Sequence, residues 1–344
     1  MNTHADPLPT APSTISFSMQ GFQDDAVATA MANAVASYIR SISRYINLER
    51  LDGVTVAHDY DDALLGLDRG VEGLRPLTRS NDDQLVGVAM APAVLRDGAV
   101  KVHMVFNAHY LHGLEETEDG EEGVGFSDTL YLLAHECAHV EVTTEKDRAF
   151  PGRILQANYS DYVEAFFAPI VEACWEEYAA CRLSAMFGAQ QLERYEEGLI
   201  GVLGVSATKS ETARTSFWQH NDLDRAALEI AAPLLEPMRI ASYAYGHLDG
   251  LDDQACLSDE AQIAIDQAGF RPFLDDLVAA LRRLWSLGPD WDDEAQFDIV
   301  ADVARDVLWY GGLLVSPTDG ESANINVWEP NLLDPHDLGL ERYW

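Results

Sequence analysis

The residues with the clearest capacity for chemistry are His135, Glu136 and His139, in the stretch His-Glu-Cys-Ala-His. On a helix of 3.6 residues per turn, side chains four residues apart lie on the same face, ~6 Å apart along the axis. Both imidazoles can then bind one Zn²⁺ ion at ~2.0–2.1 Å. Glu136 can take a proton from a water on that ion, because zinc lowers the pKa of such a water towards ~7. Roughly a few hundredths of a match is expected by chance, so the pattern predicts a zinc site with Glu136 as general base.

A catalytic zinc ion needs a third protein ligand and one open position. The best source is the helical pattern that begins after Ser160, which contains Glu172, Glu176 and Glu177. Glu177 shares a helical face with small residues, namely Ala173, Cys174, Ala180, Cys181 and Ser184. A carboxylate in such a stripe is costly to bury alone, so it favours a bound metal or cation. We therefore predict Glu177 as the third ligand, with Glu176, Glu172 and Glu145 as less favoured alternatives.

The motif and the later glutamate together resemble the gluzincin branch of the zincin metallopeptidases. In that branch the second helix commonly reads Glu-x-x-Ala-Asp-Arg, and residues 177–182 read Glu-Tyr-Ala-Ala-Cys-Arg. The order of hairpin, motif helix and glutamate helix over roughly residues 85–190 also resembles soluble bacterial ImmA/IrrE-like peptidases. The resemblance implies that His135, His139 and Glu177 bind zinc and that Glu136 is the base. It also implies that the edge strand of the hairpin aligns an extended peptide by strand addition.

The chain departs from this family pattern at Cys181, which stands where the families have Asp. That Asp usually accepts a hydrogen bond from the first histidine and so orients it. A thiol is a weaker acceptor, so either another acceptor serves, with Asp161 and Glu164 as candidates, or the site is weaker.

The spacing disfavours one other metal architecture, the metzincins, and excludes another, the di-iron bundle. Metzincins place Gly three residues and His six residues after the second histidine, and this chain has Val142 and Glu145 there. A di-iron bundle needs a second Glu-x-x-His pair, and no other histidine has Glu three residues before it.

A zinc peptidase also needs a donor for the oxyanion of the tetrahedral intermediate. The downstream candidates are His220, Tyr243, Tyr245 and His247, each of which is more often an ordinary packed or surface residue. His103 could approach the cleft from the hairpin, but a solvent-facing strand residue is the simpler interpretation. Cys137 should face away from the metal and pack in the core.

The elements around the motif predict an α+β fold with a small N-terminal sheet and a mostly helical C-terminal half. Residues 1–14 are interpreted as a disordered leader, 15–190 as a zincin-like core and 191–344 as a helical region packed on that core. Within the core, the pattern indicates a helix over 24–48 and a strand over 53–57. Two apolar arms within 84–107 flank Asp97-Gly98, which predicts a β-hairpin. The motif helix should begin at Ser127 or Asp128 and run to about Val142.

The remaining segments are predicted more coarsely. The second core helix should cover roughly 160–187, and later helical patterns lie near 222–245, 259–287 and 292–310, followed by an irregular tail from Ser316. Residues 114–125 are rich in carboxylates, but their spacing does not fit an EF-hand, so a surface loop is expected rather than a calcium site.

Composition limits the partners. The 344 residues contain 58 acidic and 22 basic side chains, for a net charge of −36. Because nucleic acid and anionic membranes require a basic face, neither is an expected partner. The acidity is typical of a solvated surface, and attraction of cationic peptides or proteins is the alternative. Four cysteines without a CxxC pair, no span of ~18 apolar residues and no secretion signal predict a cytoplasmic protein.

These observations leave three functional hypotheses. The favoured one is a cytoplasmic zinc metallopeptidase that acts on a peptide or protein substrate. The second is a regulatory or interaction protein that keeps zinc for structure or sensing. The third is a zinc hydrolase acting on a non-peptide amide, since the same chemistry attacks any activated carbonyl. Neither the substrate nor the oligomeric state follows from the sequence.

Overall fold

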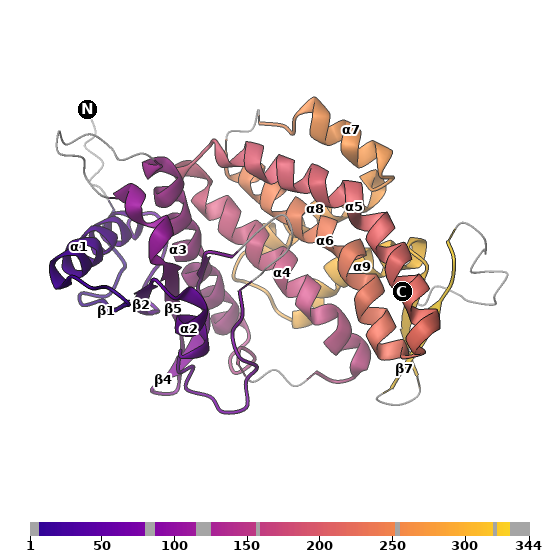
Figure 1. The fold of residues 1–344 in the computed structure, drawn as a ribbon, viewed down its shortest axis with the longest axis horizontal. Coiled ribbons are helices and arrows are strands. Elements are labelled where there is room, and N and C mark those ends of the chain that lie inside the picture. The colour runs from indigo at the N-terminus through magenta and orange to yellow at the C-terminus, as the bar shows by residue number, and fades with distance from the viewer. Residues whose placement is uncertain are drawn as a thin grey trace. The chain divides into compact units, whose positions relative to one another are not determined.

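The computed structural model describes residues 7–79, 87–114, 125–155, 159–251, 255–318 and 322–330. These residues have the expected α+β fold, with most strands early and most helices late (Figure 1). The chain divides into two compact units: one contains 1–157, 179–191 and 249–253, and the other 158–178, 192–248 and 254–344. One break falls between residues 191 and 192, next to the predicted boundary at 190, but residues 158–178 also belong to the second unit, because helix α4 (Tyr162–Ser184) begins there and ends in the first.

The first unit is built on a small mixed sheet. Its strands are β1 (Ser16–Gln20), β2 (Leu51–Ala57), β3 (Ala89–Met90), β4 (Ala93–Arg96) and β5 (Ala99–Asn107). Strands β1, β2 and β5 are parallel neighbours in that order, whereas β3 and β4 pair antiparallel to β5 at the edge. Helix α1 (Asp25–Ile42) connects β1 to β2, as a parallel connection requires.

The hairpin predicted over 84–107 is present as β4 and β5. Its turn residues Asp97 and Gly98 both have positive φ, 52° and 79°, as a two-residue hairpin turn requires. The first arm is interrupted between β3 and β4 by Ala91 and Pro92, because proline cannot donate to a strand ladder. Residues 80–86 of the predicted arm lie outside the described residues.

Alternation along the strands separates two faces of the sheet. Val54, Val56, Val102, Met104 and Phe106 join α1 and α3 (Phe126–Ala149) in the main core. On the other face, Ala57 and Val105 pack against the short helix α2 (Tyr60–Leu65). The main core therefore holds α3 against the sheet.

Helix α3 starts earlier and ends later than predicted. It begins at Phe126 after Gly125, whose φ of 84° suits glycine, and no side chain caps it, so the expected caps at Ser127 and Asp128 are wrong. Two 3-10 turns, η1 (Ala108–Tyr110) and η2 (His112–Leu114), precede the helix. The acidic segment considered for calcium lies almost wholly outside the described residues.

Residues 7–14, the described part of the expected leader, are hydrogen-bonded to the rest of the first unit. The Thr10 hydroxyl donates to the carbonyl oxygens of Ser43 and Ile46 at 2.9 and 3.1 Å and accepts from the Leu48 amide at 2.9 Å. This part of residues 1–14 is therefore ordered rather than disordered.

The second unit is mostly helical. Its elements after α4 are α5 (Gln191–His220), α6 (Leu223–Gly250), α7 (Asp259–Gln267), α8 (Arg271–Leu287), η4 (Glu294–Phe297), α9 (Asp298–Tyr310), β6 (Leu313–Pro317) and β7 (Ala323–Val327); the turn η3 (Ala185–Phe187) belongs to the first unit. The single helix expected over 259–287 is two, because Gly269 has a φ of 70°. The irregular tail expected from Ser316 instead forms the β6–β7 hairpin. Some aromatic residues of this unit are core, such as Trp175 and Trp291, whose ring centroids are 5.3 Å apart, whereas Trp218 and Tyr310 are exposed.

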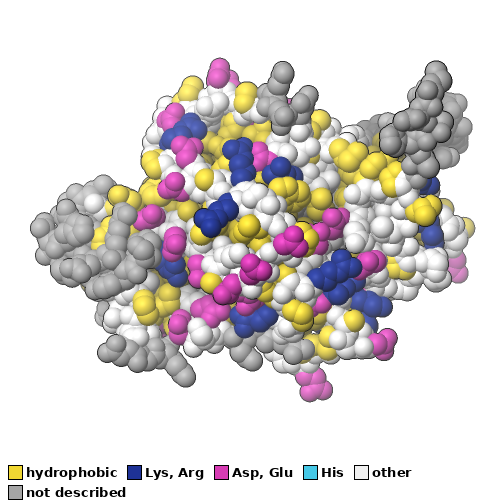
Figure 2. All heavy atoms as spheres, turned by 180° about the vertical axis from the view of Figure 1, so that it is seen from behind, with side chains coloured by type: hydrophobic (Ala, Val, Ile, Leu, Met, Phe, Trp, Pro, Cys, Tyr) yellow, Lys and Arg dark blue, Asp and Glu magenta, His cyan; other side chains and the backbone are white. Residues whose placement is uncertain are grey.

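The excess of acidic side chains does not form one contiguous patch on the face shown in Figure 2, where acidic, basic and apolar side chains are interspersed. Among the described residues, no helix combines the length and apolarity needed to cross a membrane.

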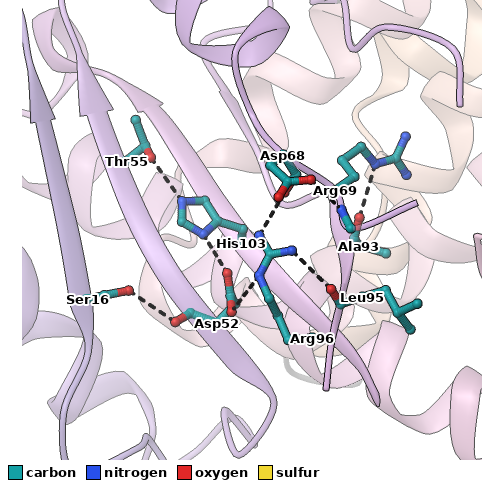
Figure 3. A network of polar contacts seen from close by, with 10 residues as sticks. Ser16, Asp52, Thr55, Asp68, Arg69, Ala93, Leu95, Arg96 and His103 are labelled. Atoms are coloured by element: carbon teal, nitrogen blue, oxygen red, sulfur yellow. Dashed lines mark hydrogen bonds and ion pairs between the residues drawn. The ribbon is translucent and has the colours of Figure 1, made fainter. Parts of the chain in front are cut away.

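The sheet face opposite α3 carries a polar network centred on His103 (Figure 3). The His103 Nδ1 lies 3.0 Å from Asp52 Oδ2, and its Nε2 lies 2.9 Å from the Thr55 hydroxyl. Arg96 also pairs with Asp52, at 3.4 Å. His103 therefore ties neighbouring strands together rather than facing solvent.

The outer edge of β4 is partly covered. The Leu95 amide donates to the Arg69 carbonyl at 2.8 Å, and the Arg69 Nε donates to the Ala93 carbonyl at 3.1 Å. Strand addition along the whole predicted edge would have to displace these bonds, whereas no described residue forms such a backbone bond to the outer edge of β3.

We predict that His103 makes folding stability depend on pH. Burial lowers the pKa of His103 below its usual 6.5, only partly opposed by Asp52. The unfolded chain then binds more protons than the folded one, so stability falls as pH drops from about 6.5 towards the lowered folded-state pKa. Urea unfolding at a series of pH values should show a shallower decline in His103→Gln than in the wild type. The control is His109→Gln, which removes an exposed histidine of the same unit; equal slopes in all three proteins would contradict the prediction.

Candidate metal centre

The motif lies in the middle of α3, on the side of the helix away from the core. Leu133, Ala134, Cys137 and Ala138 are fully buried in the main core and fix the rotation of the helix. His135 and Glu136 are nevertheless only 8% and 5% exposed, so both are polar groups in a largely desolvated position. Burying such groups costs free energy unless they have partners. Polar groups buried in this way are typical of functional sites.

The two motif imidazoles converge through the same ring atom. His135 Nε2 and His139 Nε2 are 3.2 Å apart, and the rings are nearly perpendicular at 87°. Two nitrogens bound to one tetrahedral zinc ion at ~2.05 Å would be ~3.3 Å apart. The imidazoles are therefore already spaced as ligands of a single ion.

Glu177 completes the set. One ligand atom from each of His135, His139 and Glu177 lies within 4.8 Å of the other two. Glu177 is two residues before Ala179 in the unbroken helix α4, and from Ala179 onwards that helix belongs to the same unit as α3. Two imidazoles and one carboxylate are the donor set of many catalytic zinc sites.

The alternative ligands are not brought into this group. Among the described residues it is the one set of three or more histidine, cysteine or acidic side chains spaced to hold a metal, and Glu145, Glu172 and Glu176 are outside it. Glu176 lies on the same helix, but its side chain is rotated by about 100° around the helix axis from that of Glu177.

Cys181 itself occupies the orienting position, and the substitute acceptors that we considered do not. Its Sγ lies 3.8 Å from His135 Nδ1 and accepts a hydrogen bond from the Tyr131 hydroxyl at 3.8 Å. The substitutes considered, Asp161 and Glu164, are at the start of α4, where Asp161 accepts from the Glu164 amide at 2.9 Å. Helix geometry puts them about 20–24 Å from Glu177 along the axis.

Sequence reasoning missed Tyr60. Its side chain is buried, its hydroxyl has no hydrogen-bond partner among the described residues, and it lies close enough to Glu136 to feel that charge. Burial, and secondarily Glu136, raises the pKa of Tyr60, so the phenol keeps its proton. No local pattern links a tyrosine in α2 to a glutamate more than 70 residues later.

The oxyanion candidates lie in the second unit, and each has contacts there. His220 Nδ1 accepts from the Asp222 amide at 3.1 Å, and the Tyr243 oxygen lies 3.5 Å from Arg239 Nη1. His247 is fully buried, with its ring 5.8 Å from that of Tyr195. Tyr245 lies near Arg271, whose pKa it helps to raise. These contacts fit the packed-residue interpretation of all four.

Cys137 is core, as predicted. It is fully buried, and burial, with a smaller contribution from Glu136, raises the pKa of its thiol. It is therefore an inert apolar group beside the motif.

Comparison of the chain with protein-family models, with curated proteins and with solved structures gave no match. The interpretation of the site therefore depends on its own geometry.

We predict that Glu177→Gln lowers zinc affinity by more than about 100-fold, above the range typical of residues that only support a ligand. Glu176→Gln is the matched control, because it makes the same change one residue away on another face of α4. Zinc per chain after dialysis against a weak chelator measures the effect. Retention of zinc by Glu177→Gln together with loss from Glu176→Gln or Glu172→Gln would assign the ligand differently.

Proposed function

We propose that this protein is a zinc-dependent hydrolase, a metallopeptidase in which Glu136 is the general base. The observation that supports the proposal best is the convergence of His135, His139 and Glu177 on one point, and Glu136 directly follows His135 in the chain. The resemblance to gluzincins rests on the same residues.

Each side chain has a distinct role in this proposal. His135, His139 and Glu177 hold the metal, which when bound lowers the pKa of a coordinated water to about 7 and polarises a carbonyl. Glu136 accepts a proton from the attacking water and passes it to the leaving nitrogen. Its position at 5% exposure strengthens that role, since a carboxylate removed from bulk water interacts more strongly with nearby charge.

The substrate we propose is a peptide, aligned at least in part by β3 at the open part of the sheet edge. The four cysteines are free thiols, three of them buried, which is in keeping with the reducing cytoplasm as the place of action.

We expect Glu136→Gln to abolish hydrolysis while zinc stays bound. Loss of the base should lower the rate by about 10²–10⁴-fold, because glutamine is nearly isosteric but cannot accept a proton. Zinc content and cleavage of a fluorogenic peptide library should be measured on the same preparations.

The matched control is Glu145→Gln, which makes the same change on α3 outside the metal group and should keep both zinc and activity. A wild type that binds zinc but cleaves no peptide would point to a structural or sensing metal. Full activity in Glu136→Gln would remove the role proposed for Glu136.

Electrostatics should favour cationic substrates. With a net charge of −36, the protein attracts basic peptides and repels acidic ones. We expect kcat/KM to be higher for Lys- and Arg-rich peptides than for Glu-rich peptides of equal length, and the ratio to shrink between about 0.02 M and about 0.5 M NaCl as charges are screened. If the ratio of kcat/KM for basic over acidic peptides does not change with salt, any preference between them arises from contacts within the site rather than from the net charge.

A further inference from the structure

The imidazole of His135 is held at both nitrogens. Its Nε2 faces His139 Nε2 at 3.2 Å, and its Nδ1 faces Cys181 Sγ at 3.8 Å. If Nε2 binds a metal, Nδ1 must carry the ring proton, and the sulfur is its acceptor. With the sulfur as acceptor, the contact supports the tautomer that can act as a ligand.

Cys181 is itself held in place. It is fully buried, one helical turn after Glu177, and its neighbour Ala180 belongs to the main core. On the facing helix, Tyr131 is one turn before His135, is 5% exposed and donates its hydroxyl to the same sulfur at 3.8 Å. All three groups belong to the first unit.

The approach of Tyr131 depends on Gly188. A Cβ at that position would lie 2.8 Å from Tyr131 Cδ2 and 2.9 Å from its Cβ, closer than such atoms come in proteins. The backbone of Gly188 thus packs directly against the tyrosine and helps to fix where its hydroxyl lies.

We propose that Cys181, supported by Tyr131, is the positioning residue of His135 and sets the metal affinity of the site. This inference rests on the proposed metal centre, but not on its being catalytic. Because a sulfur accepts a hydrogen bond more weakly than a carboxylate, His135 is a less basic ligand than it would be with Asp at position 181. The site therefore binds its metal less tightly than a site with Asp at position 181, because a hydrogen-bonded thiol replaces a charged carboxylate.

Substitutions at position 181 should therefore change affinity in both directions. We expect Cys181→Asp to bind Zn²⁺ about tenfold more tightly and Cys181→Ala about tenfold more weakly, the scale typical of residues that orient a metal ligand. Cys181→Ser keeps an acceptor of similar size and should stay within about threefold of the wild type. Tyr131→Phe should shift affinity in the same direction as Cys181→Ala, but less.

The affinity for Zn²⁺ alone should be measured by competition with a chromophoric chelator, on full-length protein whose fold is checked by circular dichroism. Cys174→Ala is the matched control, because Cys174 is an equally buried thiol on the same helix, seven residues earlier. If Cys181→Asp does not fold, the contrast between Cys181→Ala and Cys181→Ser decides the question. Equal affinities for Cys181→Ala, Cys181→Ser and Cys174→Ala would overturn the inference.

Co²⁺ substitution separates positioning from direct ligation. The wild type should show cobalt ligand-field bands that shift in Cys181→Asp, without a thiolate-to-cobalt charge-transfer band. A charge-transfer band that disappears in Cys181→Ala would make Cys181 a ligand and would also overturn the inference.

The outcomes distinguish this inference from the proposed function. If the position-181 variants shift zinc affinity but the wild type cleaves no peptide, the role of Cys181 is supported and the proposed peptidase function is rejected. If cleavage depends on Glu136 but the position-181 variants do not shift zinc affinity, the peptidase function is supported and the role of Cys181 is rejected. A wild type that takes up neither Zn²⁺ nor Co²⁺ would remove both.

Discussion

The site depends on one constraint, which is that α3 must bury one face while it presents two imidazoles on the other. The residues on either side of the histidines are fully buried and lock the rotation of the helix against the sheet. Because the helical repeat then fixes where positions 135 and 139 point, the core brings their Nε2 atoms to 3.2 Å, which is also a hydrogen-bonding distance. A metal ion would find this pair already arranged, and so would not have to offset the entropy of ordering it.

The helical repeat and the motif were sufficient to predict this much. The helices at the N-terminus and around the motif, the hairpin turn at Asp97-Gly98 and the placing of Cys137 in the core all follow from local spacing and turn chemistry. The position of Glu177 near the two histidines also was predictable, since a carboxylate among small buried residues indicates a close partner.

Features that depend on contacts between distant segments were not predictable. The sulfur of Cys181 reaches His135 only because α3 and the end of α4 pack together, so sequence reasoning placed the acceptor in Asp161 or Glu164 instead. Arg69 covers part of the β4 edge through its carbonyl oxygen and its Nε, and no local sequence pattern encodes these two contacts. Tyr60 and the β6–β7 hairpin were missed for the same reason: neither their burial nor their pairing is encoded in a short stretch.

The polar network of the sheet shows why residue types alone do not define a reactive centre. Thr55, His103 and Asp52 are joined in the order hydroxyl, imidazole, carboxylate, at 2.9 and 3.0 Å, the order found in serine hydrolases. Thr55 is 4% exposed in the middle of β2, whose backbone pairs with β1 on one side and β5 on the other. Those amides are committed to the sheet, so they cannot form an oxyanion hole for an acyl group on Thr55. Asp52 is moreover shared with Arg96, which makes the network a fastening between strands. Around α3, one ligand atom from each of His135, His139 and Glu177 instead lies within 4.8 Å of the other two, and this difference in surroundings, with similar residue types, is why we propose the chemistry at the motif.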